Sequence, residues 1–244
     1  MTDAELAAAL AEEAGRILLD LRANGGLEGR AIGEAGDRLA NTFLVEQLRA
    51  LRPADGLLSE ESKDTSERLA NRRVWIVDPL DGTREYGEAR PDWAVHVGLA
   101  IDGVAEIGAV ALPGLDGGFV LRSDRTTSPP AHDGPPRLLV SRTRPATEAV
   151  AVADVLGGEL VPMGSAGAKA MAVVRGQAEI YLHSGGQYEW DNCAPVAVAR
   201  AHGLYCSRID GSALRYNNRD TYLPDLLICR PEWAEQVLRA VAAL

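Results

Sequence analysis

Apolar residues recur every three to four positions over the first 51 residues, and this spacing predicts two long amphipathic helices. We expect the first helix over residues 4–23, begun by a capping box of Thr2 and Glu5 and ended by a glycine pair. We expect the second helix to follow Gly36, with Asp37 at its beginning. Each helix would bury one apolar face against a sheet.

Beyond residue 55 the apolar runs become short and rich in β-branched residues, which predicts strands. The expected strands cover residues 56–58, 74–77, 93–101, 104–112 and 118–122. Asp102 and Gly103 separate the third and fourth runs, and an Asp-Gly pair at that place is a strong hairpin signal. Residues 1–125 are therefore expected to form an α+β half, with helices on a largely antiparallel sheet.

A proline-rich segment divides the chain. Residues 126–136 contain four prolines without periodicity and indicate a linker between two halves. In residues 137–244 strands and helices alternate, which predicts an α/β half and an α/β class for the whole chain. The expected strands are 138–141, 178–182 and 226–229, and the expected helices are 147–156, 166–174, 191–202 and 231–243.

Charge and hydropathy exclude several classes of protein. The 244 residues carry a formal net charge of −10, which argues against a nucleic acid polymer as partner, because its phosphates need a basic surface. No apolar run approaches the length of a membrane span, and the acidic first 20 residues lack the basic flank of a secretory signal. We therefore expect a cytoplasmic protein without membrane association, whose three widely spaced cysteines are reduced.

The segment from Asp78 to Thr83 reads DPLDGT and directly follows an apolar strand. We expect a short turn that holds Asp78 and Asp81 three positions apart, with the Leu80 carbonyl between them. Such oxygen ligands suit a hard cation such as Mg²⁺. Gly82 and Thr83, at the start of a helix, would offer backbone N–H groups to a phosphate. Asp, Pro and Gly are also common in turns, so an ordinary turn is the alternative interpretation.

Three further acidic segments have both a structural and a catalytic interpretation. Glu60 and Glu61 are either a solvated pair or, because adjacent strand ends meet, neighbours of Asp78. Asp37 is either a helix N-cap or part of a site. Asp191 either caps a helix or brings a further carboxylate to the metal site from the second half.

Four segments together resemble the pattern of the Mg²⁺-dependent, lithium-sensitive phosphatase superfamily of inositol monophosphatases, fructose-1,6-bisphosphatases and bisphosphate nucleotidases. In chain order they are Asp37, the Glu60-Glu61 pair, DPLDGT and Trp190-Asp191. The resemblance covers nearly the whole chain. It implies a layered αβαβα sandwich with the active site in the cleft between the two halves. By analogy it also implies a homodimer.

The resemblance assigns metal ligands. Glu60, Asp78 and the Leu80 carbonyl would hold one Mg²⁺ ion. Asp78, Asp81 and Asp191 would hold a second, and a third, weaker ion would lie near Glu60. Mn²⁺ is the alternative cation.

The resemblance also assigns catalytic and phosphate-binding roles. Thr83, relayed by Asp37, would act with Glu60 to orient and deprotonate the attacking water. The backbone N–H groups of Gly82 and Thr83 would take the phosphate oxygens. A metal ion and a water near Asp191 would stabilise the leaving oxygen.

The second half carries segments similar to those of CysQ-type bisphosphate nucleotidases. Ser141 and Arg142 belong to a V-S-R segment of that kind. A glycine-rich turn with Ser165 leads to Lys169, and in such nucleotidases a lysine there meets a substrate phosphate. Inositol monophosphatases usually have small residues at that position. His183 matches neither the glutamate of the inositol enzymes nor the arginine of several nucleotidases.

The resemblance thus favours a 3′(2′),5′-bisphosphate nucleotidase that removes the 3′-phosphate of 3′-phosphoadenosine 5′-phosphate, or of its 5′-phosphosulfate analogue, in sulfate assimilation. The alternative is an inositol monophosphatase or a fructose-1,6-bisphosphatase. A metal-dependent binding protein without catalysis is a hypothesis of another class. Tyr188, Tyr216 and Asn217 either line an adenine pocket or are ordinary, partly buried side chains.

Overall fold

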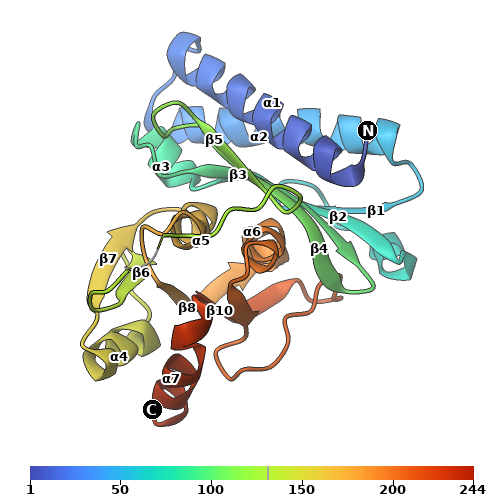
Figure 1. Cartoon of the computed structure of the whole chain (residues 1–244). Helices are drawn as coiled ribbons and strands as arrows, with labels where there is room; N and C mark the ends of the chain where they lie inside the picture. The colour runs from blue at the N-terminus through green and yellow to red at the C-terminus, as the bar shows by residue number, and fades with distance from the viewer. Residues whose placement is uncertain (131) are drawn as a thin grey trace.

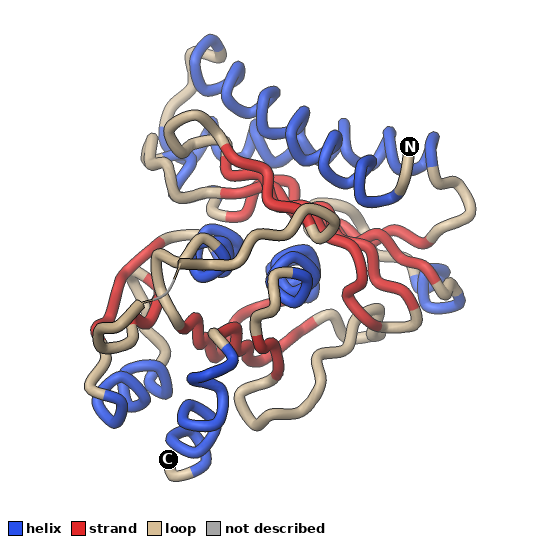
Figure 2. Tube along the Cα trace, in the orientation of Figure 1, coloured by secondary structure: helices blue, strands red, loops and turns tan. Residues whose placement is uncertain are grey.

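Five layers, alternately helical and β-sheet, build the molecule (Figures 1 and 2). The computed structural model describes residues 1–130 and 132–244. Helices α1 (Asp3–Asn24) and α2 (Gly29–Leu51) form the first layer, α5 (Ala166–Val174) and α6 (Glu189–Ala201) lie between the two sheets, and α4 (Thr147–Leu156) and α7 (Pro231–Ala242) form the last layer. The expected αβαβα sandwich is confirmed, with the two termini in opposite outer layers.

The first sheet has the strand order β1-β2-β3-β4-β5. Its strands are β1 (Gly56–Ser59), β2 (Arg73–Asp81), β3 (Ala94–Ile101), β4 (Val104–Leu112) and β5 (Phe119–Arg122). Only β1 and β2 pair in parallel, so the expected largely antiparallel sheet is confirmed. Asp102 and Gly103 have φ angles of 51° and 76°, the left-handed pair that a two-residue type I′ hairpin requires.

The second sheet is mixed and larger than expected. Its strands, in spatial order, are β7 (Glu159–Met163), β6 (Arg137–Ser141), β8 (Ile180–Tyr188), β10 (Tyr222–Cys229) and β9 (Tyr205–Ser207). The two edge strands, β7 and β9, were not predicted, because they are short and β7 is largely exposed, which leaves no apolar alternation. The predicted helices of this half are confirmed to within two residues.

Helix α2 begins earlier than predicted. It starts at Gly29 and runs through Gly33 and Gly36, so Asp37 lies inside the helix and the prediction of a helix beginning after Gly36 is wrong. The reason is close packing. A Cβ at Gly33 would lie 2.8 Å from Thr83 Cγ2, and one at Gly36 would lie 3.0 Å from a Leu80 methyl group. Because these glycines let α2 approach the DPLDGT segment, they are helix-packing positions rather than a helix stop.

Helix α6 also packs closely, against β3 and β4. Gly98 and Gly108 are register partners on these two strands. A Cβ at Gly98 would lie 2.9 Å from the Ala194 nitrogen, and one at Gly108 would lie 2.4 Å from the Ala194 oxygen. The missing side chains therefore allow α6 to lie directly on the first sheet. This contact brings the beginning of α6, with Asp191, to the sheet that carries Asp78.

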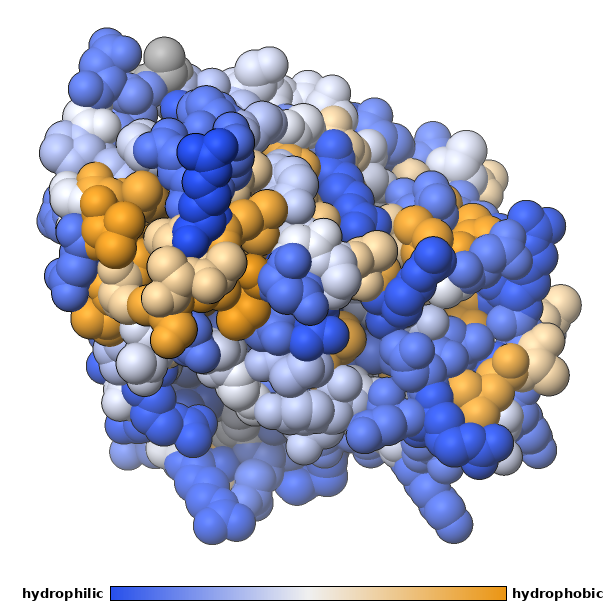
Figure 3. Space-filling view, turned by 90° about the horizontal axis from the view of Figure 1, so that it is seen from below, coloured by the Kyte–Doolittle hydropathy of each residue, from blue (hydrophilic) through white to orange (hydrophobic). Residues whose placement is uncertain are grey.

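The outer surface is mixed in character. The face formed by α4 and α7 has scattered apolar patches among hydrophilic residues (Figure 3). No helix within residues 1–130 and 132–244 combines the length and apolar character needed to cross a bilayer. Cys193, Cys206 and Cys229 are free, as predicted.

Candidate active site

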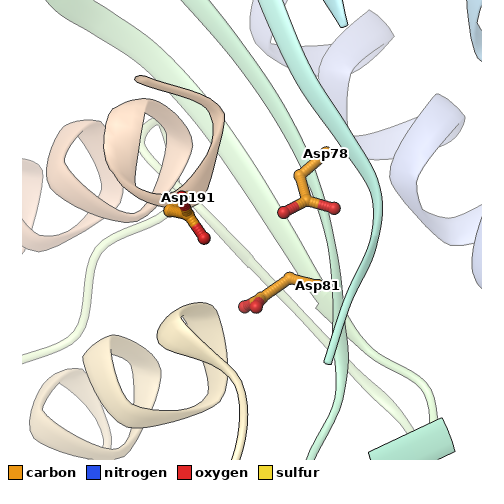
Figure 4. A group of neighbouring side chains, drawn as sticks. All are labelled: Asp78, Asp81 and Asp191. Atoms are coloured by element: carbon orange, nitrogen blue, oxygen red, sulfur yellow. The ribbon is translucent and has the colours of Figure 1, made fainter. Parts of the chain in front are cut away.

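Three aspartates from β2 and α6 form an acidic group. Asp78 and Asp81 come from the end of β2, and Asp191 comes from the first turn of α6 (Figure 4). Each offers a carboxylate oxygen, and these oxygens all lie within 4.8 Å of one another. The three side chains point toward a common space, although 110 residues separate Asp81 from Asp191 in the sequence.

A β-bulge at the end of β2 makes this grouping feasible. Asp78 pairs with His96 and Asp81 pairs with Ala94, so Pro79 and Leu80 together oppose one residue of β3. In a regular strand, residues three positions apart point to opposite faces. One extra residue reverses that relation and directs both carboxylates to the same face. The DPLD segment, predicted as a turn, is therefore the bulged end of a strand.

Asp81 is held firmly by the second half of the molecule. Its Oδ2 atom accepts hydrogen bonds from Ser165 Oγ at 2.5 Å and the Gly167 N–H at 2.6 Å, and its Oδ1 atom accepts one from the Ala166 N–H at 3.1 Å. These donors belong to the N-terminus of α5, where the helix dipole favours a negative charge. Burial opposes ionisation of Asp81, but the contact with His96 and the hydrogen bonds outweigh it and lower the pKa to about 2.

The other carboxyl groups of the site lack such support. Burial, with the charges of Glu60 and Asp81, raises the pKa of Asp78 well above its ordinary value. Burial and the charge of Asp81 raise the pKa of Asp191 to about 7. Its Oδ2 atom accepts one hydrogen bond, from the Tyr188 N–H at 2.7 Å. Carboxyl groups that are largely buried and repel one another favour a positive charge nearby.

Glu60 completes the acidic group from β1. Ser59 pairs with Val77 in the parallel ladder, so Glu60 follows β1 beside Asp78, as adjacent strand ends predict. Glu60 and Asp78 are close enough that each carboxyl group affects the pKa of the other. Burial and the surrounding carboxylates raise the pKa of Glu60 to about 7, although its side chain keeps access to solvent. Glu61 is exposed.

These residues fit a divalent cation. The donor atoms of the three aspartates are all oxygens, as hard cations require, and they come from two separate segments, β2 and α6, that a bound ion would join. None of the ion pairs within residues 1–130 and 132–244 joins Asp78, Asp191 or Glu60 to a lysine or arginine. A bound cation would supply the positive charge that the protein itself does not provide.

Thr83 and Asp37 form a second polar contact, next to the acidic group. Thr83 Oγ1 lies 3.3 Å from Asp37 Oδ1 and 3.1 Å from the Leu80 carbonyl oxygen. Burial and the charge of Glu61 raise the pKa of Asp37 to about 7. Gly82 adopts the left-handed region with φ of 89°, and this turns the chain from β2 into the short helix α3 (Thr83–Gly87).

Hydrogen bonds from residues of α5 stabilise the turn before this helix. Ser165 caps the helix by accepting a hydrogen bond from the Ala168 N–H. Lys169 is buried, and its ammonium group donates to the Ser165 carbonyl at 2.5 Å and the Gly164 carbonyl at 3.3 Å. Burial lowers the pKa of Lys169. The lysine therefore directs its charge to the carbonyls of the turn whose N–H groups hold Asp81.

Three of the predicted substrate residues have their polar contacts outside the acidic group. Arg142 pairs with Glu85 at 2.6 Å and with Glu88 at 2.9 Å, and this joins β6 to α3. Ser141 Oγ accepts a hydrogen bond from the Arg144 N–H. His183 contacts the carbonyl of the nearby Gly185, and burial lowers its pKa to about 4.

His96 is a residue of the site that the sequence analysis missed. It lies on β3 with its side chain fully buried, and its Nε2 atom is 3.2 Å from Asp81 Oδ2. Burial alone would lower its pKa, but Asp81 raises it above the ordinary value. The sequence offered little signal, because a single histidine among the apolar residues of a strand is usually a core residue. The bulge that brings Asp81 to it is also invisible in the apolar pattern.

Comparisons with known proteins agree with this geometry. Residues 3–244 match the inositol monophosphatase family. The chain is 51% identical over 255 residues to the 3′-phosphoadenosine 5′-phosphate phosphatase of Mycobacterium leprae, across 99% of this chain and 94% of that protein. It is 29% identical over 199 residues to the 3′(2′),5′-bisphosphate nucleotidase CysQ of Escherichia coli, across 78% of this chain and 81% of that protein.

Solved structures show the same fold. The inositol monophosphatase from Anabaena (Nostoc) sp. PCC 7120 superposes with a TM-score of 0.79 at 23% identity, across 99% of this chain and 95% of that one. CysQ from Bacteroides thetaiotaomicron superposes with a TM-score of 0.76 at 24% identity, across 92% of this chain and 96% of that one. The chain therefore belongs to the inositol monophosphatase family.

Proposed function

We propose that this protein is a Mg²⁺-dependent phosphatase that removes the 3′-phosphate of 3′-phosphoadenosine 5′-phosphate and releases AMP. The observation that carries the proposal is the acidic group of Asp78, Asp81 and Asp191, gathered by a bulge and a helix packed on glycines. Relatives that are 51% identical and carry that activity in their names support this substrate. The proposed reaction would clear a by-product of sulfate assimilation in the cytoplasm.

Five residues would hold the cations. Glu60, Asp78 and the Leu80 carbonyl would form one set of ligands, and Asp78, Asp81 and Asp191 the other, for two or three Mg²⁺ ions, or Mn²⁺ in their place. When bound, these cations would lower the pKa of water and neutralise charge on the phosphoryl group. The raised pKa values of Asp78, Asp191 and Glu60 support this assignment, because ionised carboxyl groups here need a counter-charge.

Thr83 and Asp37 would together orient the attacking water and accept its proton. With a pKa of about 7, Asp37 can accept a proton near neutral pH and hold it within the contact to Thr83 Oγ1. The packing of α2 against this segment, through Gly33 and Gly36, fixes the distance between the two side chains. Glu60, which also has a pKa of about 7, is a second acceptor, next to Asp78.

Backbone groups and a lysine would receive the substrate. The first N–H groups of a helix have no partner inside it, so those of Gly82 and Thr83 are suited to phosphate oxygens. We propose that Lys169, whose ammonium group lies at the turn before α5, supplies positive potential for the second phosphate of the substrate. We also propose substrate-binding roles for Arg142, Ser141 and His183. To bind a substrate, Arg142 would first have to break its ion pairs with Glu85 and Glu88.

Among Tyr188, Tyr216 and Asn217, the contacts favour Tyr188 as the residue that binds the nucleotide base. Tyr216 donates to the Asn192 side chain, and Asn217 is bonded to Glu189 and Arg68, so both serve internal networks. Tyr188 is 41% exposed and stacks on Trp190, with ring centroids 4.9 Å apart and planes 8° apart. Its N–H also donates to Asp191. We propose that Tyr188 stacks on the adenine, a contact typically worth about 1–3 kcal/mol per base.

Side-by-side phosphate release tests the proposal. The substrates are 3′-phosphoadenosine 5′-phosphate, inositol 1-phosphate and fructose 1,6-bisphosphate, each with Mg²⁺ and with or without lithium. We expect kcat/KM for the nucleotide to exceed the others by at least about tenfold, or about 1.4 kcal/mol of transition-state discrimination. A preference for either sugar phosphate would overturn the nucleotide assignment and leave the metal site standing. Chromatography with light scattering would separately test the proposed homodimer.

A further inference from the structure

We infer that His96 is the positioning residue for Asp81, anchored by the beginning of α6, and that it thereby sets the cation affinity of the acidic group. The inference rests on the metal site of the proposed function. His96 itself is no part of that ligand set. Its role follows from where its two ring nitrogens lie.

The imidazole of His96 joins the two sides of the site. Its Nδ1 atom lies 3.0 Å from the Trp190 carbonyl oxygen, in the residue directly before Asp191. Its Nε2 atom lies 3.2 Å from Asp81 Oδ2. His96 is also the register partner of Asp78 in the β2–β3 ladder. One buried ring therefore contacts or neighbours the segments that carry all three aspartates.

Both ring nitrogens face oxygen acceptors. A carbonyl oxygen can only accept, so Nδ1 must carry a hydrogen to bond with Trp190. An ionised Asp81 likewise requires a donor at Nε2. The contact of Nε2 with Asp81 is not a well-aligned hydrogen bond, although it is an ion pair when the ring is protonated, and Nε2 has no other partner within residues 1–130 and 132–244. His96 thus links the Trp190 carbonyl to Asp81 through its two ring nitrogens.

Helix α5 closes the space around the ring. A Cβ at Gly167 would lie 2.0 Å from His96 Nε2, so only glycine at that position lets the ring and the helix coexist. The same Gly167 donates its N–H to Asp81 Oδ2. The carboxylate is therefore held between the helix N-terminus and the ring, in one orientation relative to Asp191.

This arrangement has a measurable consequence for cation binding. Some groups orient a metal ligand without touching the metal. Their removal typically lowers the metal affinity by about 10–100-fold. Without His96, Asp81 would lose one of the groups that fix its rotamer, and the Trp190 carbonyl would lose its buried partner. The alternative is that His96 only fills space in the core, in which case its polar atoms would not matter.

Two isosteric variants separate these possibilities. In His96→Gln the amide nitrogen takes the place of Nε2 and keeps a donor for Asp81. In His96→Asn the amide nitrogen takes the place of Nδ1 and leaves Asp81 without that donor. His202→Asn is the matched control, because His202 is a buried histidine that contacts a carbonyl, of Val198, at the far end of α6.

Isothermal titration of the purified full chain with MgCl₂ is the measurement, with melting in metal-free buffer as a folding check. We expect H96N to weaken Mg²⁺ binding by about 10–100-fold and H96Q by less than about tenfold. H202N should bind like the wild type. Wild-type affinity in H96N, or equal losses in H96Q and H96N, would overturn the inference. If H96N does not fold, Gly167→Ala is the replacement variant, because its added methyl group would displace the His96 ring. We expect Gly167→Ala to weaken Mg²⁺ binding, and an unchanged affinity would contradict the inference.

The same titration distinguishes the inference from the proposed function. Absence of Mg²⁺ binding by the wild type would overturn the metal site and the inference with it. Binding by the wild type together with unchanged binding by H96N would overturn the inference alone. The measurement does not depend on turnover, so the choice of substrate does not affect it.

Discussion

Replacing Asp78 and Asp81 by asparagine, one at a time, should abolish activity in both cases but change stability in opposite directions. Both residues are proposed cation ligands, so both variants should lose Mg²⁺-dependent phosphate release. Without metal, the two carboxylates differ. Asp81 receives donors from Ser165, Ala166 and Gly167, whereas Asp78 is buried among other acids.

The magnitude for Asp81 follows from its pKa. A fall from 3.8 to about 2 favours the folded state at any pH above 3.8, and the benefit is lost only as pH falls through about 2. At 1.36 kcal/mol per pKa unit, this is about 2 kcal/mol, or about 4–8 °C in Tm for a domain of this size. Asn at position 81 would also direct its NH₂ group toward the donors of Ser165, Ala166 or Gly167, which would destabilise the folded state further. For Asp78 the raised pKa has the opposite sign, so D78N should melt at or above the wild-type temperature.

Thermal melts at pH 8 in EDTA, repeated with Mg²⁺, provide the assay. We expect the order D78N, then wild type, then D81N in EDTA. In Mg²⁺ the wild type should gain more than either variant, because a ligand stabilises only the state that binds it. If D78N melted as far below the wild type as D81N in EDTA, the electrostatic reasoning for the acidic group would be refuted.

Three further predictions concern the catalytic pair, the substrate lysine and pH. Thr83→Ala should lower kcat by about 10²–10⁴-fold with little change in Tm, and Thr83→Ser should restore most of it; a wild-type kcat in T83A would exclude the proposed proton path. Lys169→Met should reduce kcat/KM at least about tenfold more for the bisphosphate nucleotide than for inositol 1-phosphate, and equal losses would count against the nucleotide assignment. In EDTA, Tm should fall as pH rises from about 4 to 8, because Asp191 and Glu60, with pKa values of about 7, bind more protons folded than unfolded. A Tm that rose over this window would contradict those values.

The sequence predicted the elements of this fold well where apolar periodicity and turn chemistry agreed. The hairpin at Asp102-Gly103 and the capping box of Thr2 and Glu5 are both present. The DPLDGT motif identified the end of β2, because its composition is unusual whatever its conformation. These features depend on neighbours in the chain, so local sequence is sufficient to specify them.

The remainder depends on contacts between distant segments. Gly33 and Gly36 look like helix breakers in the sequence, but the side chains of Thr83, Leu80 and Tyr86 make them packing positions in α2. The β2 bulge arises from pairing with β3, and His96 becomes part of the site only because α5 and α6 enclose it. No periodicity within one segment encodes such a relation. For that reason the acidic residues that the structure brings together could be named from the sequence as a set, whereas the groups that orient them could not.

We propose that the acidic group at the β2 bulge supports cation-dependent hydrolysis of a nucleotide 3′-phosphate. The most direct test is the formation of AMP from 3′-phosphoadenosine 5′-phosphate by the purified chain, followed as Mg²⁺ is added to protein first freed of metal with EDTA. We expect no AMP in EDTA and saturable AMP formation as Mg²⁺ rises, and we expect no AMP from the Asp81→Asn variant. Equal AMP formation in EDTA, or none at any Mg²⁺ concentration, would contradict the proposed function.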